Sequence, residues 1–235
     1  MRHTYRHALI VGVGTGLSAS LARALAARGM RVSLAARGAG KLAALAAETG
    51  ATAHVCDAAD AGAVAALFAE LDGTPDGGGA PDVVVYNPSA RVRGPLASLD
   101  PAAVAHAVGV TALGAFYVAR EAVIRMEREG RGAVLFTGAS AGVKGYAHSA
   151  PFAMGKFALR GLAQSMAREL HPKGIHVGHF VIDGAIRNPG RAEPSDAPDS
   201  MLDPDAIARS YCDFLDQDRS AWAWEIELRP WVERF

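Results

Sequence analysis

The chain has 235 residues, of which 50% are hydrophobic and 20% are charged, a composition that is typical of a folded globular protein. Its 24 acidic residues balance its 24 basic residues, so the overall charge does not indicate binding to nucleic acid or to an anionic membrane surface. We therefore expect neither partner. Any recognition of phosphate must come from a local site.

Signals for export, membrane insertion and metal binding are also missing from the sequence. The first apolar run begins at Ala8 and is too short for a signal peptide or a membrane span. The two cysteines, Cys56 and Cys212, lie far apart and have no metal-ligand spacing. His176 and His179 fall in a predicted strand, where a separation of three places side chains on opposite faces. We expect a cytoplasmic protein without a metal site.

Short apolar runs alternate with helical segments along most of the chain. The predicted strands are 8–13, 31–36, 51–56, 82–87, 133–138, 175–182 and 224–230. Their nearly continuous apolar character is typical of parallel strands that are covered on both faces. The predicted helices are 17–28, 39–49, 60–71, 101–129, 152–170 and 204–216. This alternation predicts one α/β domain over 1–235, a doubly wound parallel sheet of about seven strands with helices on both faces.

Three segments interrupt this pattern. A Gly/Pro-rich turn is expected at 72–81, before the fourth strand. A polar loop at about 183–203 is long enough to be a lid or a disordered segment. The C-terminal strand and tail, about 220–235, carry Trp222, Trp224 and Trp231. These rings are expected to be buried, either between subunits or within one subunit.

A glycine-rich loop joins the first predicted strand to the first predicted helix. Its residues are Gly12, Gly14, Thr15, Gly16 and Leu17, with Val13 between the first two. Glycines at this place let the backbone turn sharply and approach a pyrophosphate, which then lies at the positive end of the helix. The alternative is a simple turn between strand and helix. The position within an alternating chain favours dinucleotide binding.

The end of the second predicted strand favours NADP(H) over NAD(H). Sites for NAD usually place an acidic residue there, on the ribose 2′-hydroxyl. Here the strand ends at Ala36 and is followed by Arg37, whose guanidinium suits a 2′-phosphate. The alternative is a solvated arginine. Asp57, after the third strand, is expected near the adenine amino group or, alternatively, as the N-cap of the next helix.

These motifs resemble those of the short-chain dehydrogenase/reductase family over nearly the whole chain, which implies a single-domain Rossmann fold. Gly12-x3-Gly16 is similar to the family's TGxxxGxG, with Ser18 in place of the last glycine. Tyr86-Asn87-Pro88-Ser89 matches its NNAG segment, although only Asn87 is kept. Asp183-Gly184-Ala185-Ile186 resembles its PGxxxT segment, with Asn188 at the Thr position. By resemblance, Asn87, Gly184 and Ile186 belong to the cofactor site.

The resemblance also locates the family's Ser-Tyr-Lys active site, and shows that it is altered. Lys156 matches the lysine, which binds the nicotinamide ribose and activates the tyrosine; Phe152 stands at the tyrosine position. The serine position falls on Ala139, with Ser140 one residue further along, either in the pocket after a small shift or as an ordinary loop serine. Thr111 aligns with the supporting Asn and either holds a water or bonds its own helix backbone.

Two functions are compatible with this pattern. The first is an NADP(H)-dependent oxidoreductase for an unknown small carbonyl or alcohol substrate, handicapped because loss of a general acid costs about 10²–10⁴ in rate. Tyr146 or His148 is a candidate substitute acid, and Arg91 and Arg93 either shape the substrate pocket or are solvated. The second is a non-catalytic NADP(H)-binding sensor or assembly partner. The family resemblance implies a homodimer or homotetramer in either case.

Overall fold

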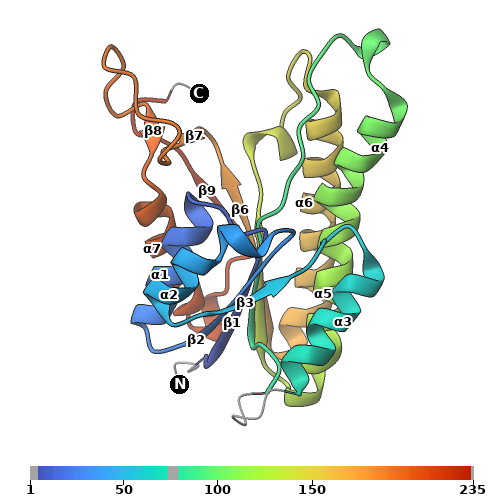
Figure 1. Cartoon of the computed structure of the whole chain (residues 1–235), viewed down its shortest axis with the longest axis vertical. Coiled ribbons are helices and arrows are strands. Elements are labelled where there is room, and N and C mark those ends of the chain that lie inside the picture. The colour runs from blue at the N-terminus through green and yellow to red at the C-terminus, as the bar shows by residue number, and fades with distance from the viewer. Residues whose placement is uncertain (1–4, 74–78, 234–235) are drawn as a thin grey trace.

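The computed structural model describes residues 5–73 and 79–233. Within them, seven parallel strands form one sheet in the order β3-β2-β1-β4-β5-β6-β9 (Figure 1). The strands are His7–Val11 (β1), Arg31–Ala36 (β2), Thr52–Val55 (β3), Val83–Tyr86 (β4), Gly132–Thr137 (β5), Ile175–Ile182 (β6) and Glu225–Leu228 (β9). Each corresponds to one of the predicted strands, and the predicted fold class is confirmed.

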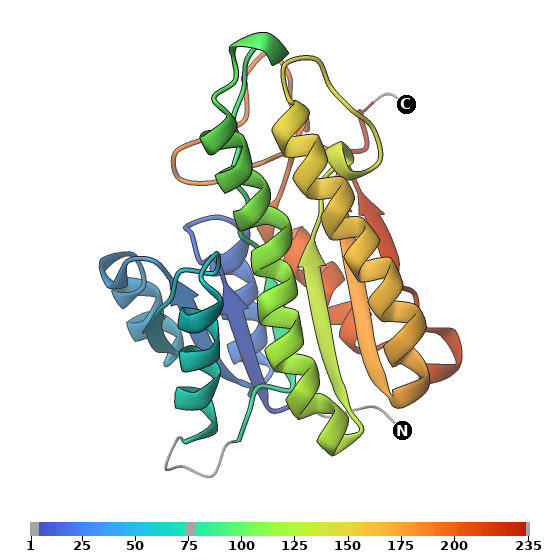
Figure 2. The ribbon, with the colours of Figure 1, turned by 90° about the vertical axis from the view of Figure 1, so that its right-hand side faces the viewer.

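Helices cover both faces of this sheet. They are Leu17–Ala27 (α1), Ala43–Thr49 (α2), Ala61–Asp72 (α3), Pro101–Val108 (α4), Gly114–Glu129 (α5), Ala150–Leu170 (α6) and Pro204–Leu215 (α7). Residues of α1, α2 and α7 pack on one face in one apolar cluster, and residues of α3, α5 and α6 pack on the other face in a second cluster. Figure 2 shows α5 and α6 side by side over that second face.

Burial explains why the strands are nearly continuous in apolar character. All residues of β1, β4, β5 and β6 are buried, since each of these strands lies between two others and under helices on both faces. The edge strand β3 is mostly exposed. The central strands therefore contribute apolar side chains to both clusters.

In the part of the chain that the structure describes, three α-helices begin at an aspartate whose side chain accepts from backbone N–H groups of the first turn. Asp60 accepts from Gly62 N and Ala63 N at the start of α3. Asp100 and Asp203 cap α4 and α7 in the same way, and a proline follows each of them at the first helical position. Such caps and prolines fix where a helix begins because they match the unpaired N–H groups there.

The predicted helix 101–129 contains a turn of π-helix. This turn, Gly109–Leu113, separates α4 from α5 without breaking the helical run. Among the described residues, one helical run, Pro101–Glu129, is long and apolar enough to cross a membrane, judged by length and composition only. The mean hydropathy of its most apolar window is 1.7. In the fold it packs beside α3 and α6.

The predicted lid loop is tied together at its base rather than irregular throughout. Ala185–Ile186 (β7) pairs in parallel with Met201–Leu202 (β8), and Arg187 N donates to Leu202 O at 3.0 Å. In Figure 1 this pair stands above the sheet, on the opposite side from the first turns of α4 and α6. Residues 74–78 of the predicted turn 72–81, and residues 234–235 of the tail, lie outside the described residues.

Candidate functional site

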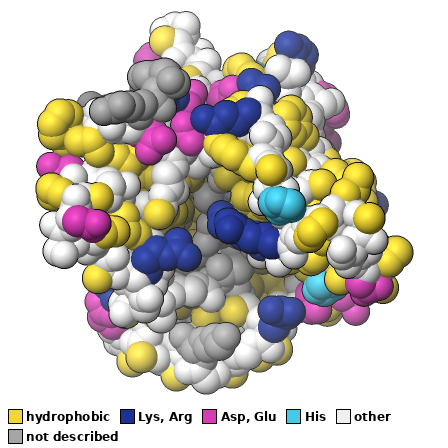
Figure 3. Space-filling model, turned by 90° about the horizontal axis from the view of Figure 1, so that it is seen from above, with side chains coloured by type: hydrophobic (Ala, Val, Ile, Leu, Met, Phe, Trp, Pro, Cys, Tyr) yellow, Lys and Arg dark blue, Asp and Glu magenta, His cyan; other side chains and the backbone are white. Residues whose placement is uncertain are grey.

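A cleft lies at the carboxyl ends of the strands, where ligands bind in open α/β sheets. The larger of its two hollows, about 880 Å³, is lined by residues that follow β1, β4, β5 and β6. The smaller, about 340 Å³, is lined by residues that follow β1, β2, β3 and β4. Asn87 and Ser89 line both hollows, so the two hollows are adjacent. Figure 3 shows the central hollow from above, with Lys and Arg side chains around it.

The glycine loop sits where the two hollows meet. Gly12 has φ +82°, and a Cβ there would lie 2.5 Å from Pro88 Cγ, so the backbone needs glycine at this position. Gly16 is the N-cap of α1 and brings no side-chain cap, which leaves the N–H groups of the first turn to a ligand. Gly16 and Leu17 line the larger hollow, whereas Gly14 and Thr15 are exposed and line neither hollow.

Ser18 joins the glycine loop to the end of β4. Its hydroxyl donates to Gly12 O at 3.2 Å and accepts from Asn87 Nδ2 at 2.6 Å. Asn87 N donates to Val11 O at 3.0 Å, which fixes the asparagine backbone as well. Sequence reasoning missed this bond because nothing in the local pattern at Ser18 indicates a partner 69 residues away. The serine thus holds the loop and Asn87 together.

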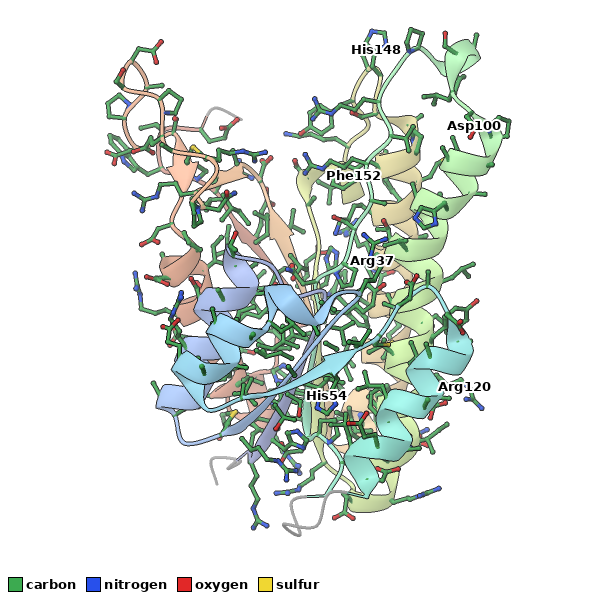
Figure 4. The ribbon with its side chains drawn as sticks, in the orientation of Figure 1. Arg37, His54, Asp100, Arg120, His148 and Phe152 are labelled. Carbon is green, nitrogen blue, oxygen red and sulfur yellow. The ribbon has the colours of Figure 1, made fainter. Side chains whose placement is uncertain are left out.

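Arg37 and Asp57 both line the smaller hollow. Arg37 is exposed, and within the described chain no carboxylate pairs with it. Figure 4 shows it on the loop that follows β2. Asp57 Oδ1 accepts from Ala59 N at 3.0 Å. The predicted alternative of Asp57 as N-cap is wrong, because Asp60 caps α3.

The residues present fit a dinucleotide. An open glycine loop at the start of α1 lies between a hollow that contains Arg37 and one that contains Lys156. Gly184 and Ile186, after β6, also line the larger hollow. Gly184 has φ +155°, and a Cβ there would lie 2.9 Å from Pro230 Cδ, so the turn into β7 requires glycine. Among the described residues, no group of three or more His, Cys, Asp or Glu side chains is arranged to hold a metal ion.

Lys156 lies deep in the larger hollow. Its side chain comes from α6 and is buried, and Nζ donates to Thr137 O at 2.6 Å. Burial, together with the nearby Arg91 charge, lowers the pKa of the Lys156 amine to about 7. Burial therefore disfavours the charged form of this amine.

Phe152 lies one helical turn before Lys156 and faces the same hollow (Figure 4). Its ring is 8% exposed, and the Lys156 Nζ lies 5.8 Å from the ring centroid. The Arg91 guanidinium covers the ring, with Cζ at 4.2 Å from the centroid. The phenyl ring is thus a platform for a cation. The sequence pointed to Arg91 as a possible pocket residue but carried no signal for this contact.

Ser140 and Tyr146 form a pair in the same hollow. Ser140 begins the short helix Ser140–Gly142, and both residues line the cavity, as does Ala139. Tyr146 donates its phenolic O–H to Ser140 Oγ at 3.0 Å. Lys144 lies beside Tyr146, with Nζ 5.7 Å from the ring centroid, and a hydrogen bond with Tyr146 raises the pKa of Lys144. His148 is exposed, does not line the hollow and stands well above Phe152 in Figure 4.

Thr111 lies behind the site rather than in it. It is fully buried in the π-helical turn and lines neither hollow. Its Oγ1 accepts from Ala90 N at 3.2 Å, a partner that differs from both the water and the helix backbone expected for it. The contact ties the π-helical turn to the segment that carries Arg91. Thr111 therefore positions that segment and has no contact with the cavity.

Comparison with known proteins agrees with this geometry. A family model described as short chain dehydrogenase matches residues 6–193. Human 17-beta-hydroxysteroid dehydrogenase type 1 is 32% identical over 122 residues, which are 52% of this chain and only 37% of that relative. A short-chain dehydrogenase from Rhodopseudomonas palustris has a crystal structure with TM-score 0.82 and 32% identity, covering 97% of this chain and 100% of that one. A metagenomic short-chain oxidoreductase in complex with NADP gives TM-score 0.83 and 26% identity, covering 97% and 98%.

Proposed function

Because the chain belongs to the short-chain dehydrogenase family, we propose that it is an NADP(H)-dependent oxidoreductase that acts on a small carbonyl or alcohol substrate. The observation that carries this proposal is the cleft. It runs from Arg37 in one hollow, past the glycine loop, to Lys156 in the other. NADP in the complex of a 26% identical structure also supports it.

Each end of the cleft has a task. Arg37 would bind the 2′-phosphate, Asp57 would lie near the adenine, and the first turn of α1 would receive the pyrophosphate. Lys156 would bind the nicotinamide ribose through Nζ, and Asn87, Gly184 and Ile186 would line the path of the cofactor. The bound cofactor supplies a hydride to the carbonyl carbon or accepts one from the alcohol.

The proton for the carbonyl oxygen needs a source other than Phe152, because a phenyl ring has no proton to give. We propose Tyr146, whose O–H lies in the larger hollow on Ser140. The phenol would pass its proton to the substrate oxygen as the hydride arrives at carbon, and its exposed side would regain a proton from water. The Lys144 ammonium beside the ring would stabilise the phenolate in between.

A cofactor titration followed by a substrate screen tests the function. NADPH binding is measured by the quenching of tryptophan fluorescence, and a panel of carbonyl compounds is then screened by loss of NADPH absorbance. We expect binding and turnover, and a loss of about 10²–10⁴ in kcat for Tyr146→Phe. His148→Asn, on the same loop, is the matched control and should keep its activity.

The alternative function is a non-catalytic NADP(H)-binding protein, a sensor or assembly partner. The replacement of the tyrosine by Phe152 is the observation that favours it. Tight NADPH binding without turnover of any carbonyl compound would support this alternative and reject the oxidoreductase. Absence of NADPH binding would reject both. The cytoplasmic location, and the absence of membrane and nucleic-acid partners, remain predictions.

A further inference from the structure

Three arginines converge on the larger hollow. Arg91 and Arg93 come from the segment that follows β4, and Arg191 comes from the lid. All three are exposed to solvent. Within residues 5–73 and 79–233, no carboxylate forms an ion pair with any of them. Arg160, by contrast, is paired with Glu225 at 2.6 Å.

Their charges are close enough to act on one another. Arg91 is exposed only in part; burial of the remainder lowers its pKa, and the charges of Arg93 and Arg191 lower it further. Repulsion among these positive charges lowers the stability of the folded protein when no ligand is bound. A ligand of opposite charge in the hollow would remove that repulsion.

The hollow offers little negative charge to balance them. Asp183 lines it, but its carboxylate lies 3.7 Å from both Lys144 Nζ and an Arg229 nitrogen. Glu233 is the other acidic residue among the described lining residues. Lys156 adds a further basic group deeper inside. The hollow is therefore electropositive at the place where the substrate must enter (Figure 3).

Arg91 is also held in place by aromatic packing. Its guanidinium lies 4.2 Å from the centroid of the Phe152 ring, a distance typical of cation–π contacts. A guanidinium over an aromatic ring can still bind two oxygens side by side through the N–H groups at its edge. The phenyl ring of Phe152 thus holds a guanidinium that can bind an anion.

We propose that the substrate carries an anionic group, a carboxylate or a phosphate, that is bound by the Arg91 guanidinium on the face of Phe152, with Arg93 and Arg191 beside it. This inference rests on the proposed function. The cofactor phosphates have separate binding elements in the glycine loop, α1 and Arg37, so Arg91 is left for the substrate. Its reactive carbonyl would then lie toward Lys156 and Tyr146.

Calorimetry on the NADP⁺-loaded protein tests the inference, since no hydride can be transferred in that complex. The probes are small oxo acids, the methyl esters of the same acids, and inorganic phosphate. We expect the acids to bind about tenfold to a hundredfold more tightly than their esters, as for a charge-assisted hydrogen bond. Phosphate that competes with the acids at similar concentration would identify phosphate as the anionic group; weak competition would identify carboxylate.

Two variants locate the binding group. Arg91→Leu keeps an apolar stem over Phe152 and should abolish the preference for acids while leaving NADP⁺ affinity unchanged. Phe152→Leu removes the ring face and should weaken the preference several-fold. Arg128→Leu, an exposed arginine near the far end of α5, is the matched control and should behave as the parent.

Equal affinities for acids and esters would overturn the inference, as would an Arg91→Leu variant that keeps the preference. An Arg91→Leu variant that loses NADP⁺ affinity would also overturn it, because Arg91 would then serve the cofactor. A parent protein that binds NADPH and reduces only neutral carbonyls would preserve the proposed function and overturn this inference alone. A parent that binds no NADP(H) would reject the proposed function and, with it, the inference.

Discussion

At the scale of single residues, cofactor choice depends on Arg37. Its side chain is exposed at the smaller hollow and has no acidic partner among the described residues. We expect Arg37→Ala to lose most of the preference for NADP(H) over NAD(H), about tenfold to a hundredfold, the range for a hydrogen bond to a charged group. Calorimetry with both cofactors measures the preference. Arg209→Ala, at an exposed site on α7, is the control, and equal affinities in the parent would contradict the assignment.

Lys156 is expected to bind the cofactor even without a tyrosine to activate. Lys156→Met keeps the length of the stem but removes the charge and the donors of Nζ, including the one on Thr137 O. We expect weaker NADPH binding by about tenfold, the loss of a hydrogen bond to a charged group. The protein should remain folded, since the methionine stays apolar in a buried place. Unchanged NADPH affinity would show that Nζ serves only the fold.

Phe152→Tyr tests whether the site can regain the missing acid. The ring lies in the cleft, between Arg91 and Lys156, so the added hydroxyl would be near two basic groups that favour its ionised form. We expect near-parent stability and a gain of about 10²-fold or more in carbonyl reduction. Thermal unfolding and NADPH absorbance measure the two effects. A loss of about 1–3 kcal/mol would instead mean that the hydroxyl is buried without a partner.

At the scale of elements, the helical layer over β4, β5 and β6 has an apolar outer face. Leu113 and Phe116 lie at the junction of the π turn with α5, and Met154 and Phe157 lie on α6; between 46% and 54% of each is exposed. Figure 2 shows these helices adjacent and facing outward. We propose that this face binds a second copy of the chain, in keeping with the expected homodimer or homotetramer.

Sedimentation measures that assembly. We expect the parent to be a dimer or a tetramer, and Phe157→Arg to shift it toward the monomer, because a charge would be buried in the interface. Leu96→Arg changes an apolar residue that is 77% exposed outside these helices and serves as the control. A monomeric parent, or a variant that assembles as the parent does, would contradict the proposal.

The elements were largely predictable, and the contacts within the site were not. The strand and helix positions follow from runs of apolar residues and from local caps such as Asp100-Pro101, which are properties of neighbouring residues. The bond of Ser18 with Asn87 and the packing of Arg91 on Phe152 join residues about 60 to 70 positions apart. Their residue types alone do not determine them, because the folded chain brings them together. For the same reason the sequence left Ser140 open and did not predict the bond from Ala90 N to Thr111 Oγ1.

At the scale of the whole molecule, buried histidines couple stability to pH. Burial lowers the pKa of His7, His176 and His179 to about 4. An unfolded chain takes up protons on these rings below about 6.5, whereas the folded chain does so only near 4. The free energy of unfolding is therefore unaffected above pH 6.5 and should fall as the pH decreases from about 6.5 to 4.

Urea unfolding across this range measures the effect. His176 is stacked between Phe214 and Trp222, with ring centroids at 4.0 and 4.3 Å, so His176→Phe retains the stacking and removes one titrating ring. We expect a shallower pH dependence in this variant. His106→Gln, at an exposed position on α4, should keep the slope of the parent. A parent of constant stability between pH 6.5 and 4 would show that these rings titrate normally.

The strand of the sheet that is synthesised last is β9, and its position affects the order of folding during synthesis. β9 pairs with β6, and Glu225 on β9 bonds both the buried His179 and Arg160 of α6. Until the ribosome has made residues 225–228, β6 has an open edge on which backbone groups and His179 lack their partners. An open strand edge invites pairing with another chain. The nascent protein therefore keeps this edge open until late in synthesis, when nearly all of its core residues have already been made.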